Sequence, residues 1–130
     1  MRRLGSSVRI MVALLGLQVV AGHAAGQSAD RFQLETAGDL LRVCTPDEGA
    51  RLRSDLLHFC QGFMLGNGQL YEQLVRAGSI KRPWACAEPV PRLAEIREAF
   101  VTWARAHPER HMERAVDGVW HAMSERWPCR

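Results

Sequence analysis

The chain has 130 residues, with 17 lysine and arginine residues against 14 aspartate and glutamate residues and a net charge of +3. Three of the basic residues, Arg2, Arg3 and Arg9, lie near the N-terminus, and the remaining 14 balance the 14 acidic residues. A neutral chain with interspersed charges gives no electrostatic reason to expect nucleic-acid binding, and its length fits a single domain.

An uncharged, mostly apolar run from Ile10 to Val20 follows these arginines, which is the pattern of a secretory signal peptide. The run is too short to cross a bilayer comfortably, because a spanning helix needs roughly 17–25 apolar residues. We expect a signal peptide over residues 1–24, with cleavage after Ala24 or after Gly26. No cysteine lies near that site, so no stable membrane anchor is predicted. Four cysteines in an exported chain favour the periplasm of a Gram-negative bacterium.

Residues 27–130 predict a small all-α domain of four to five helices. No stretch alternates apolar and polar residues with a period of two, so no strand is expected. Turn and capping residues set the helix ends. The predicted helices run over Phe32–Val43, from a cap at Ser54 or Asp55 to about Ala77 with Gly78 just beyond, from Pro89 or Pro91 to about Ala106, and from Pro108 to Pro128.

Apolar residues spaced by threes and fours define the faces that these helices should bury. The second helix is expected to bury Leu56, Cys60, Phe63, Met64, Leu70, Tyr71 and Leu74. The third is expected to bury Leu93, Ile96, Phe100 and either Trp103 or Ala104. The fourth is expected to bury Met112, Ala115, Val116, Val119 and Met123.

The four cysteines allow three disulfide connectivities. Consecutive helices joined by short loops usually pack antiparallel. This brings Cys44, after the first helix, near Cys60, and it brings Cys86, before the third helix, near Cys129. We therefore predict Cys44–Cys60 and Cys86–Cys129, which would contribute about 3 and about 4 kcal/mol by loop entropy. A zinc site or a redox-active pair is disfavoured, because the sequence has no Cys-x-x-Cys pair.

The second predicted helix contains Gly62, Gly66 and Gly68. An interior glycine costs a helix about 1 kcal/mol relative to alanine, so a compensating role is expected. Close packing of another helix within the domain is the favoured interpretation. A homodimer face is the second, and a kink or a ligand cleft is the third.

No arrangement of side chains predicts a catalytic, cofactor or metal site. His107 and His111 have the spacing of metal ligands, but Pro108 lies between them and no HExxH motif is present. Their structural or surface roles are favoured. Carboxylates on the helices have arginine neighbours, as solvated faces do. An enzyme is therefore the least favoured class of function.

The segment Ser79–Trp84 is the favoured protein-binding loop, with Lys81, Arg82 and Trp84 as its candidate contact residues. Tryptophan and arginine are over-represented at binding hot spots. The alternative for Trp84 is that it folds back over the disulfide of Cys86. The turn Thr45–Ala50 is the second candidate loop.

Several segments together resemble the Rap/Tai immunity-protein family. Cys60–Gly66 resembles the family's Cys-x-Gly-aromatic-x-x-Gly helix, and Cys86–Pro89 resembles its Cys-x-Pro helix start with one extra residue. His107–Glu109 and the ending Trp127–Cys129 resemble its His-Pro-Glu and Phe-Pro-Cys tail. The resemblance covers roughly Thr36–Cys129. It implies a disulfide-stapled helical fold similar to acid-stress chaperones of the HdeA type.

The resemblance also implies a function. Studied members of the family are periplasmic proteins that neutralise amidase effectors of type VI secretion. The first hypothesis is therefore an immunity protein that occludes the active site of a peptidoglycan amidase. The alternative is an HdeA-like periplasmic stress chaperone or envelope factor without a dedicated toxin partner.

Overall fold

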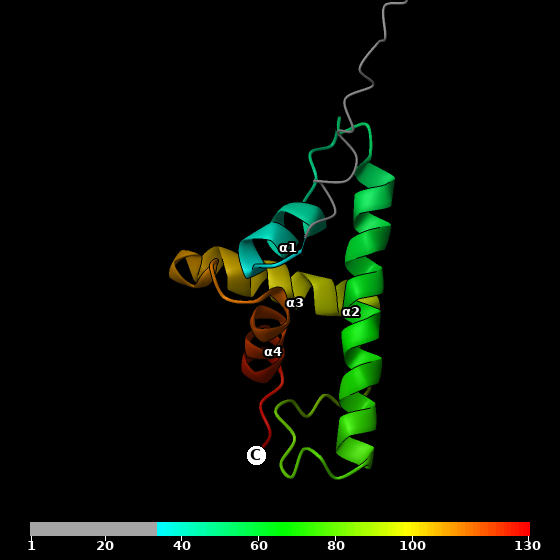
Figure 1. The fold of residues 1–130 in the computed structure, drawn as a ribbon, viewed down its shortest axis with the longest axis vertical. Coiled ribbons are helices and arrows are strands. Elements are labelled where there is room, and N and C mark those ends of the chain that lie inside the picture. Colours follow the sequence, from blue (N-terminus) through cyan, green and yellow to red (C-terminus); the bar gives the residue numbers. More distant parts are fainter. Residues whose placement is uncertain (1–33) are drawn as a thin grey trace, which may run out of the picture.

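The computed structural model describes residues 34–130, and it contains four α-helices and one short 3-10 helix (Figure 1). The elements are α1 (Ala37–Cys44), α2 (Arg53–Arg76), α3 (Leu93–Ala106), η2 (Pro108–Arg110) and α4 (Ala115–Arg126). Within the described residues the β structure is confined to an isolated bridge between Thr36 and Arg114. The all-α prediction is thus confirmed. The predicted signal peptide and its cleavage sites lie outside the described residues.

Helix α1 begins at Ala37 rather than at the predicted Phe32, which lies outside the described residues. A capping box sets this start. The Thr36 hydroxyl accepts a hydrogen bond from the Asp39 amide at 3.1 Å, and the Asp39 carboxylate accepts one from the Thr36 amide at 3.0 Å. The first two amides of the helix donate to carbonyl oxygens of Glu113 and His111, at 2.8 and 2.9 Å. The chain before α4 therefore completes the N-terminus of α1.

Helix α2 begins two to three residues earlier than predicted, and neither of the predicted caps, Ser54 and Asp55, caps it. Leu52 occupies the capping position without a side-chain hydrogen bond. The predicted end of the helix is confirmed. Gly78 follows it with φ of 69°, the left-handed conformation that glycine adopts most easily.

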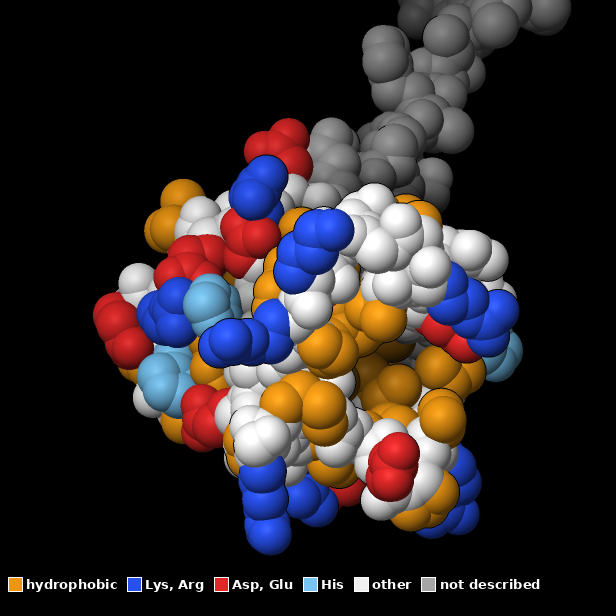
Figure 2. Space-filling model, turned by 90° about the horizontal axis from the view of Figure 1, so that it is seen from below, with side chains coloured by type: hydrophobic (Ala, Val, Ile, Leu, Met, Phe, Trp, Pro, Cys, Tyr) orange, Lys and Arg blue, Asp and Glu red, His pale blue; other side chains and the backbone are white. Residues whose placement is uncertain are grey.

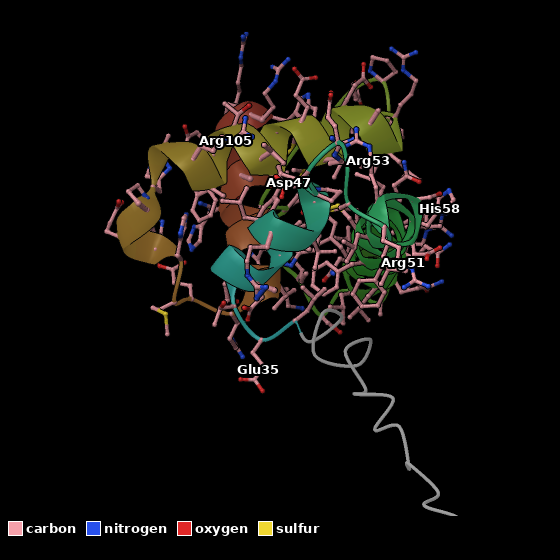
Figure 3. All side chains as sticks on the ribbon, turned by 90° about the horizontal axis from the view of Figure 1, so that it is seen from above. Glu35, Asp47, Arg51, Arg53, His58 and Arg105 are labelled. Atoms are coloured by element: carbon pink, nitrogen blue, oxygen red, sulfur yellow. A yellow bond between two sulfur atoms is a disulfide. The ribbon has the colours of Figure 1, made fainter. Side chains whose placement is uncertain are left out.

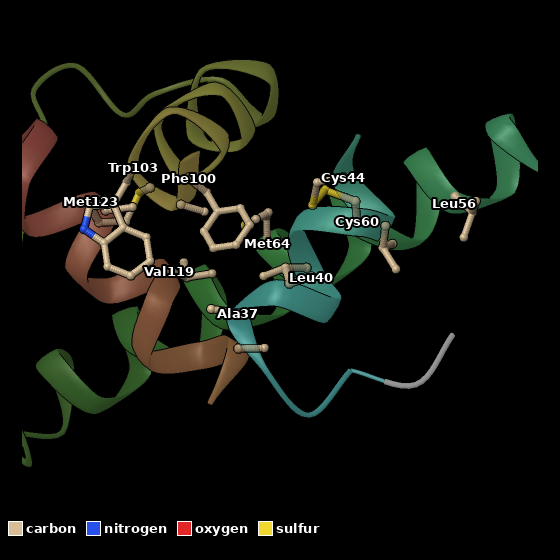
Figure 4. Close-up of a cluster of buried hydrophobic side chains, with 14 residues drawn as sticks. Ala37, Leu40, Cys44, Leu56, Cys60, Met64, Phe100, Trp103, Val119 and Met123 are labelled. Carbon is tan, nitrogen blue, oxygen red and sulfur yellow. A yellow bond between two sulfur atoms is a disulfide. The ribbon is translucent and has the colours of Figure 1, made fainter. Parts of the chain in front are cut away.

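The core lies between α1, α3, α4 and the N-terminal half of α2 (Figure 4). Phe100 and Leu40 are its largest fully buried side chains. Helix α2 contributes three buried side chains, Leu56, Cys60 and Met64. The remaining buried residues are Ala37, Val43, Cys44, Trp103, Ala104, Ala115, Gly118, Val119, Ala122 and Met123.

The predicted burial of Leu70 and Leu74 on α2 is wrong. These side chains are 58% and 36% exposed. Figure 1 shows why: the C-terminal half of α2 extends past α1 and α3, so the helix continues its apolar face beyond the core. A periodic pattern identifies a face, but it does not show where the covering helices end.

The predicted burial of Met112 is also wrong, because the region after Pro108 is not one helix. Pro108 starts the short helix η2, and α4 begins only at Ala115. Met112 lies between the two elements and is 84% exposed. His111 and Met112 form a turn, and Arg114 then pairs with Thr36 in the isolated bridge before α4 begins.

Both predicted disulfides are present. Cys44–Cys60 joins the end of α1 to α2 across a Cα–Cα distance of 5.2 Å, and both residues are fully buried. Cys86–Cys129 joins the segment before α3 to the residues after α4, with a Cα–Cα distance of 4.9 Å. Because they close loops of 16 and 43 residues, each should stabilise the fold by roughly 3–4 kcal/mol.

The close helix contact occurs at Gly118 and not at the α2 glycines, so the favoured interpretation of those glycines is wrong. A Cβ atom at Gly118 would lie 2.8 Å from the Ala37 Cβ atom and 3.2 Å from the Trp103 ring. A Cβ atom at Gly62, Gly66 or Gly68 would meet no atom of the described residues within 4 Å. Helix α1 therefore approaches α4 closely, whereas the α2 glycines face open space.

The surroundings of Gly118 and Gly66 predict that substitution by alanine has opposite effects on stability at the two positions. Gly118→Ala should destabilise the protein by about 1–3 kcal/mol, because Ala37 cannot move without displacing α1. Gly66→Ala should stabilise it by about 0.5–1 kcal/mol, because alanine favours the helix and its methyl group has space. Urea unfolding of the two oxidised variants measures both values. Equal effects at the two positions would contradict the assignment.

The capping box predicts a pH-dependent contribution from Asp39. Hydrogen bonds from the Thr36 hydroxyl and amide, and then from Arg42, lower the pKa of Asp39 from 3.8 to about 2. The ionised carboxylate therefore stabilises the fold above pH 3.8, and this contribution disappears as the pH falls through about 2. Asp39→Asn should lose about 1 kcal/mol at pH 7, as lost caps do, and should approach wild-type stability near pH 2.

Urea unfolding at several pH values measures this contribution. Asp47→Asn, in the exposed turn after α1, is the matched control. The difference between wild type and Asp39→Asn should shrink with acid, while the difference for the control stays constant. A constant difference for both variants would refute the capping role.

Candidate functional site

The longest connection in the described chain joins α2 to α3 and runs over residues 77–92. It has no helix or strand of its own. Connections of this length are uncommon in compact domains and are often functional. Cys86 holds it through the disulfide to Cys129 and through a 2.9 Å hydrogen bond from its amide to the Trp127 carbonyl oxygen. We call residues 77–92 the stapled loop.

An aromatic cluster holds the middle of the stapled loop against α2 and α4. The Tyr71 hydroxyl accepts a 2.7 Å hydrogen bond from the Trp84 amide. The ring centroids lie 5.8 Å apart for Tyr71 and Trp84, 4.5 Å for Tyr71 and Trp120, and 5.6 Å for Trp84 and Trp120. Trp84 therefore packs on these two rings, and it remains 49% exposed.

The two predicted cationic contact residues lie just before this cluster. Lys81 and Arg82 are exposed, and neither forms an ion pair within the part of the chain that the structure describes. The loop reaches them by turning back on α2, where the amides of Ser79 and Ile80 both donate to the carbonyl oxygen of Leu74. The structure thus brings Lys81, Arg82 and Trp84 to one end of the molecule.

Two hollows flank the contact between Tyr71 and Trp120, and both residues line both hollows. The first, which we call the apolar cleft, lies between α2, the start of α3 and α4, with a volume of about 760 Å³. The second, which we call the outer groove, lies between α2 and α4, with a volume of about 610 Å³. Figure 2 looks onto this end, where hydrophobic side chains surround a hollow.

Exposed apolar side chains concentrate around these hollows. Seven large hydrophobic residues of the described chain are strongly exposed, and five of them lie on the second half of α2 or on the stapled loop. These five are Leu65, Leu70, Leu74, Trp84 and Val90. An apolar patch of this kind on a small domain marks an interaction surface. The sequence prediction found Trp84 but missed Tyr71, Trp120 and both hollows, because the rings meet only in the folded chain.

The second candidate loop, Thr45–Ala50, lies at the other end of the molecule, where two arginine side chains donate to backbone carbonyl oxygens in and just before it. The Arg53 guanidinium donates to the Pro46 carbonyl oxygen at 2.8 Å, and the Arg97 guanidinium donates to the Cys44 carbonyl oxygen at 3.1 Å. Figure 3 shows Asp47, Arg51, Arg53 and His58 around this region. Its hollow measures about 340 Å³ and is the smaller feature.

The histidines that were considered as metal ligands instead cap α3. A ring nitrogen of His107 lies 2.9 Å from the Trp103 carbonyl oxygen, and one of His111 lies 2.8 Å from the Ala104 carbonyl oxygen. The last carbonyls of a helix need such donors. Within residues 34–130 no three His, Cys, Asp or Glu side chains are grouped so that they could hold a metal ion.

A polar cluster packs on the Trp103 ring nearby. The Arg110 guanidinium lies 5.6 Å from the ring centroid and donates to Glu113 at 2.6 Å. It also lies 2.7 Å from the Nε2 atom of His121. These contacts join η2 to α4, which is a structural role.

The fold and the site define a small, disulfide-stapled, all-α binding domain with an exposed apolar surface at one end. No helix among the described residues combines the length and apolar character that spanning a bilayer requires. The model of the Rap1a immunity proteins matches residues 36–129. The chain therefore belongs to the Rap1a immunity protein family, and this membership implies a non-enzymatic protein that binds an effector protein. No curated protein and no solved structure matches the chain.

The Tyr71 hydroxyl predicts a specific loss of order in the stapled loop. Tyr71→Phe keeps the ring contact with Trp120 but removes the acceptor for the Trp84 amide. Stability should fall by about 1 kcal/mol, as for other lost hydrogen bonds. Hydrogen exchange should become faster at the Trp84 amide and stay unchanged at amides in α3. Unchanged exchange at Trp84 would show that the disulfide alone orders the loop.

Proposed function

We propose that this chain is a periplasmic immunity protein that binds a peptidoglycan amidase effector and occludes its active site. The observation that carries this proposal is the family match over residues 36–129, which contains both disulfides, the stapled loop and both hollows. The family supplies the class of function. The choice of an amidase comes from the resemblance to the studied members of that family.

The proposed mechanism is steric. An occluding loop must resist displacement by the enzyme groove that it fills, so flexible loops are poor inhibitors. The stapled loop is held at Cys86 by a disulfide and near Trp84 by the Tyr71 hydroxyl. Between these points and the end of α2 it presents Lys81 and Arg82 to solvent. A half-exposed tryptophan beside two cations has the composition of a binding hot spot.

Export to the periplasm is part of the proposal, and two features support it. The N-terminal pattern is that of a signal peptide, although it lies outside the described residues. The two disulfides need an oxidising compartment. A homodimer stays a prediction, supported by the outward-facing Gly62 and Gly66 on α2.

The second candidate function is an HdeA-like stress chaperone. The observation that favours it is the apolar surface on α2 and the stapled loop, which could hold unfolded clients. Acid would protonate the carboxylates of the surface ion pairs and make the domain strongly positive. In this case binding should be weak, unselective and stronger at low pH.

The experiment that tests the proposal is retention of partners by the mature, oxidised protein from periplasmic and secreted fractions. Mass spectrometry should identify one stoichiometric peptidoglycan amidase. That amidase, once purified, should lose activity on peptidoglycan at a one-to-one ratio. Retention of many proteins, increasing with acid, would reject the immunity function in favour of the chaperone.

The stapled loop predicts which variants lose the complex. Trp84→Ala should weaken binding of the retained amidase by about tenfold or more, as loss of an aromatic anchor does. Arg82→Ala and Lys81→Ala should mainly slow association, because rim charges steer encounter. Surface plasmon resonance measures both effects, and circular dichroism should show that the variants stay folded.

Two exposed residues away from the loop serve as controls. Met112→Ala removes an exposed apolar side chain, and Arg105→Ala removes a cation on the end of α3 far from α2 (Figure 3). Both should bind like the wild type. Wild-type affinity in the Trp84 and Arg82 variants would exclude the stapled loop as the contact surface.

A further inference from the structure

We propose that the apolar cleft is the anchor pocket of the effector interface, and that it takes an uncharged apolar side chain from the partner's polypeptide. This inference rests on the proposed function and names the chemistry that the partner presents. It concerns a different place from the cationic tip of the stapled loop, because neither Lys81 nor Arg82 lines the cleft.

The cleft reaches the core of the molecule. Its floor includes Met64, Val119 and Met123, which are buried core residues. Leu65 and Val90 stand at its mouth and are 46% and 88% exposed. A volume of about 760 Å³ lies in the range of pockets that bind ligands. An apolar side chain that enters would therefore exchange water for apolar contacts on several sides.

The charges at the rim decide which occupant fits. Glu72 pairs with Arg76, and Arg92 pairs with Glu95 at 3.4 Å, so each rim charge already has a partner within its own segment. The other polar side chains of the lining are uncharged: the amides of Asn67 and Gln69, the hydroxyl of Tyr71, and the indoles of Trp120 and Trp127. A charged ligand finds no unpaired counter-charge here, whereas a neutral polypeptide finds apolar walls and amide groups. This is the pattern of an interface hot spot, with an apolar centre and a neutral polar rim.

The cleft is formed before any partner binds. On one side, α2 is fixed to α1 by the Cys44–Cys60 disulfide. On the other, the stapled loop is fixed by Cys86–Cys129. The contact between Tyr71 and Trp120 closes the cleft toward the outer groove. Because the walls need little ordering on association, more of the binding energy is retained.

A pair of glycines on α2 gives a test that does not depend on damaging the fold. Gly68 lines the cleft, and Gly62 does not. A Cβ atom at either position meets no described atom within 4 Å. Gly68→Leu should add an isobutyl group to the wall of the cleft and narrow it, and Gly62→Leu is its matched control on the same helix. Both replace glycine with a good helix former, so both variants should melt at or above the wild-type temperature.

Two probes report on the cleft. The first is the neutral dye N-phenyl-1-naphthylamine, whose fluorescence rises in apolar surroundings. The second is the purified amidase that the wild-type protein retains. We expect the wild type and Gly62→Leu to bind both probes, with the amidase displacing the dye. We expect Gly68→Leu to lose the dye and to bind the amidase at least about tenfold more weakly.

Each other outcome overturns a defined part of the proposal. Amidase affinity that is equal in Gly68→Leu and wild type would reject the cleft while leaving the proposed function intact. Dye that stays bound when the amidase binds would show that the cleft serves another, small apolar ligand. If the wild type retains no amidase, the proposed function fails, and the occupant named here fails with it.

Discussion

The Cys44–Cys60 disulfide holds the N-terminal half of α2 against α1, and the placement of the whole helix depends on it. Helix α2 has 24 residues, but its buried side chains end at Met64. The disulfide lies within this buried part, beside Leu40 and Phe100 in the core. Beyond Met64 the helix continues for three turns without core packing. The helix is anchored at one end and extends beyond the helices that cover it. Its apolar side chains at the other end therefore remain exposed.

The second disulfide restrains the segment that follows the uncovered half of α2. Cys86–Cys129 ties the stapled loop to the end of α4, and Tyr71 and Trp120 join α2 to α4 in the same region. The uncovered part of α2 is thus held by one aromatic contact and one stapled loop. Away from these two contacts, this part of α2 does not pack against α4 or the start of α3, and this leaves the apolar cleft and the outer groove. Small domains with little core use disulfides to keep such open geometry stable.

The order of the helices was enough to predict both disulfides, because antiparallel neighbours place their ends together. The same local argument failed for the glycines. Gly118 was not singled out, although it permits the close approach of α1, because that contact joins residues 81 positions apart. The glycine-rich stretch of α2 attracted attention, but its glycines face open space. Nothing in the packing of the described residues explains Gly62 and Gly66.

The candidate site was predicted only in part, because residue types can be read from the sequence and contacts between distant segments cannot. Trp84, Arg82 and Lys81 could be selected because their residue types are typical of interfaces. The cleft could not, since it is made by Met64, Leu93 and Val119 from three helices. Leu70 and Leu74 lie on the same face of α2 as its buried residues, so their spacing in the sequence is that of buried residues. Their exposure depends on where α1 and α3 end, which is a property of the tertiary structure.

The contacts that hold α2, between Tyr71 and Trp120 and with the stapled loop, also distinguish the two candidate functions, because an immunity protein and a chaperone need different surfaces. A chaperone of the HdeA type must enlarge its apolar surface under acid. Opening the hollows would separate Tyr71 from Trp120, a contact between α2 and α4 that neither disulfide bridges directly. An inhibitor needs the reverse, a surface that stays closed and fixed. The hydrogen bond from the Trp84 amide to the Tyr71 hydroxyl adds a polar link that involves no carboxylate. A loop that is tied to α2 in this way favours the fixed surface of an inhibitor.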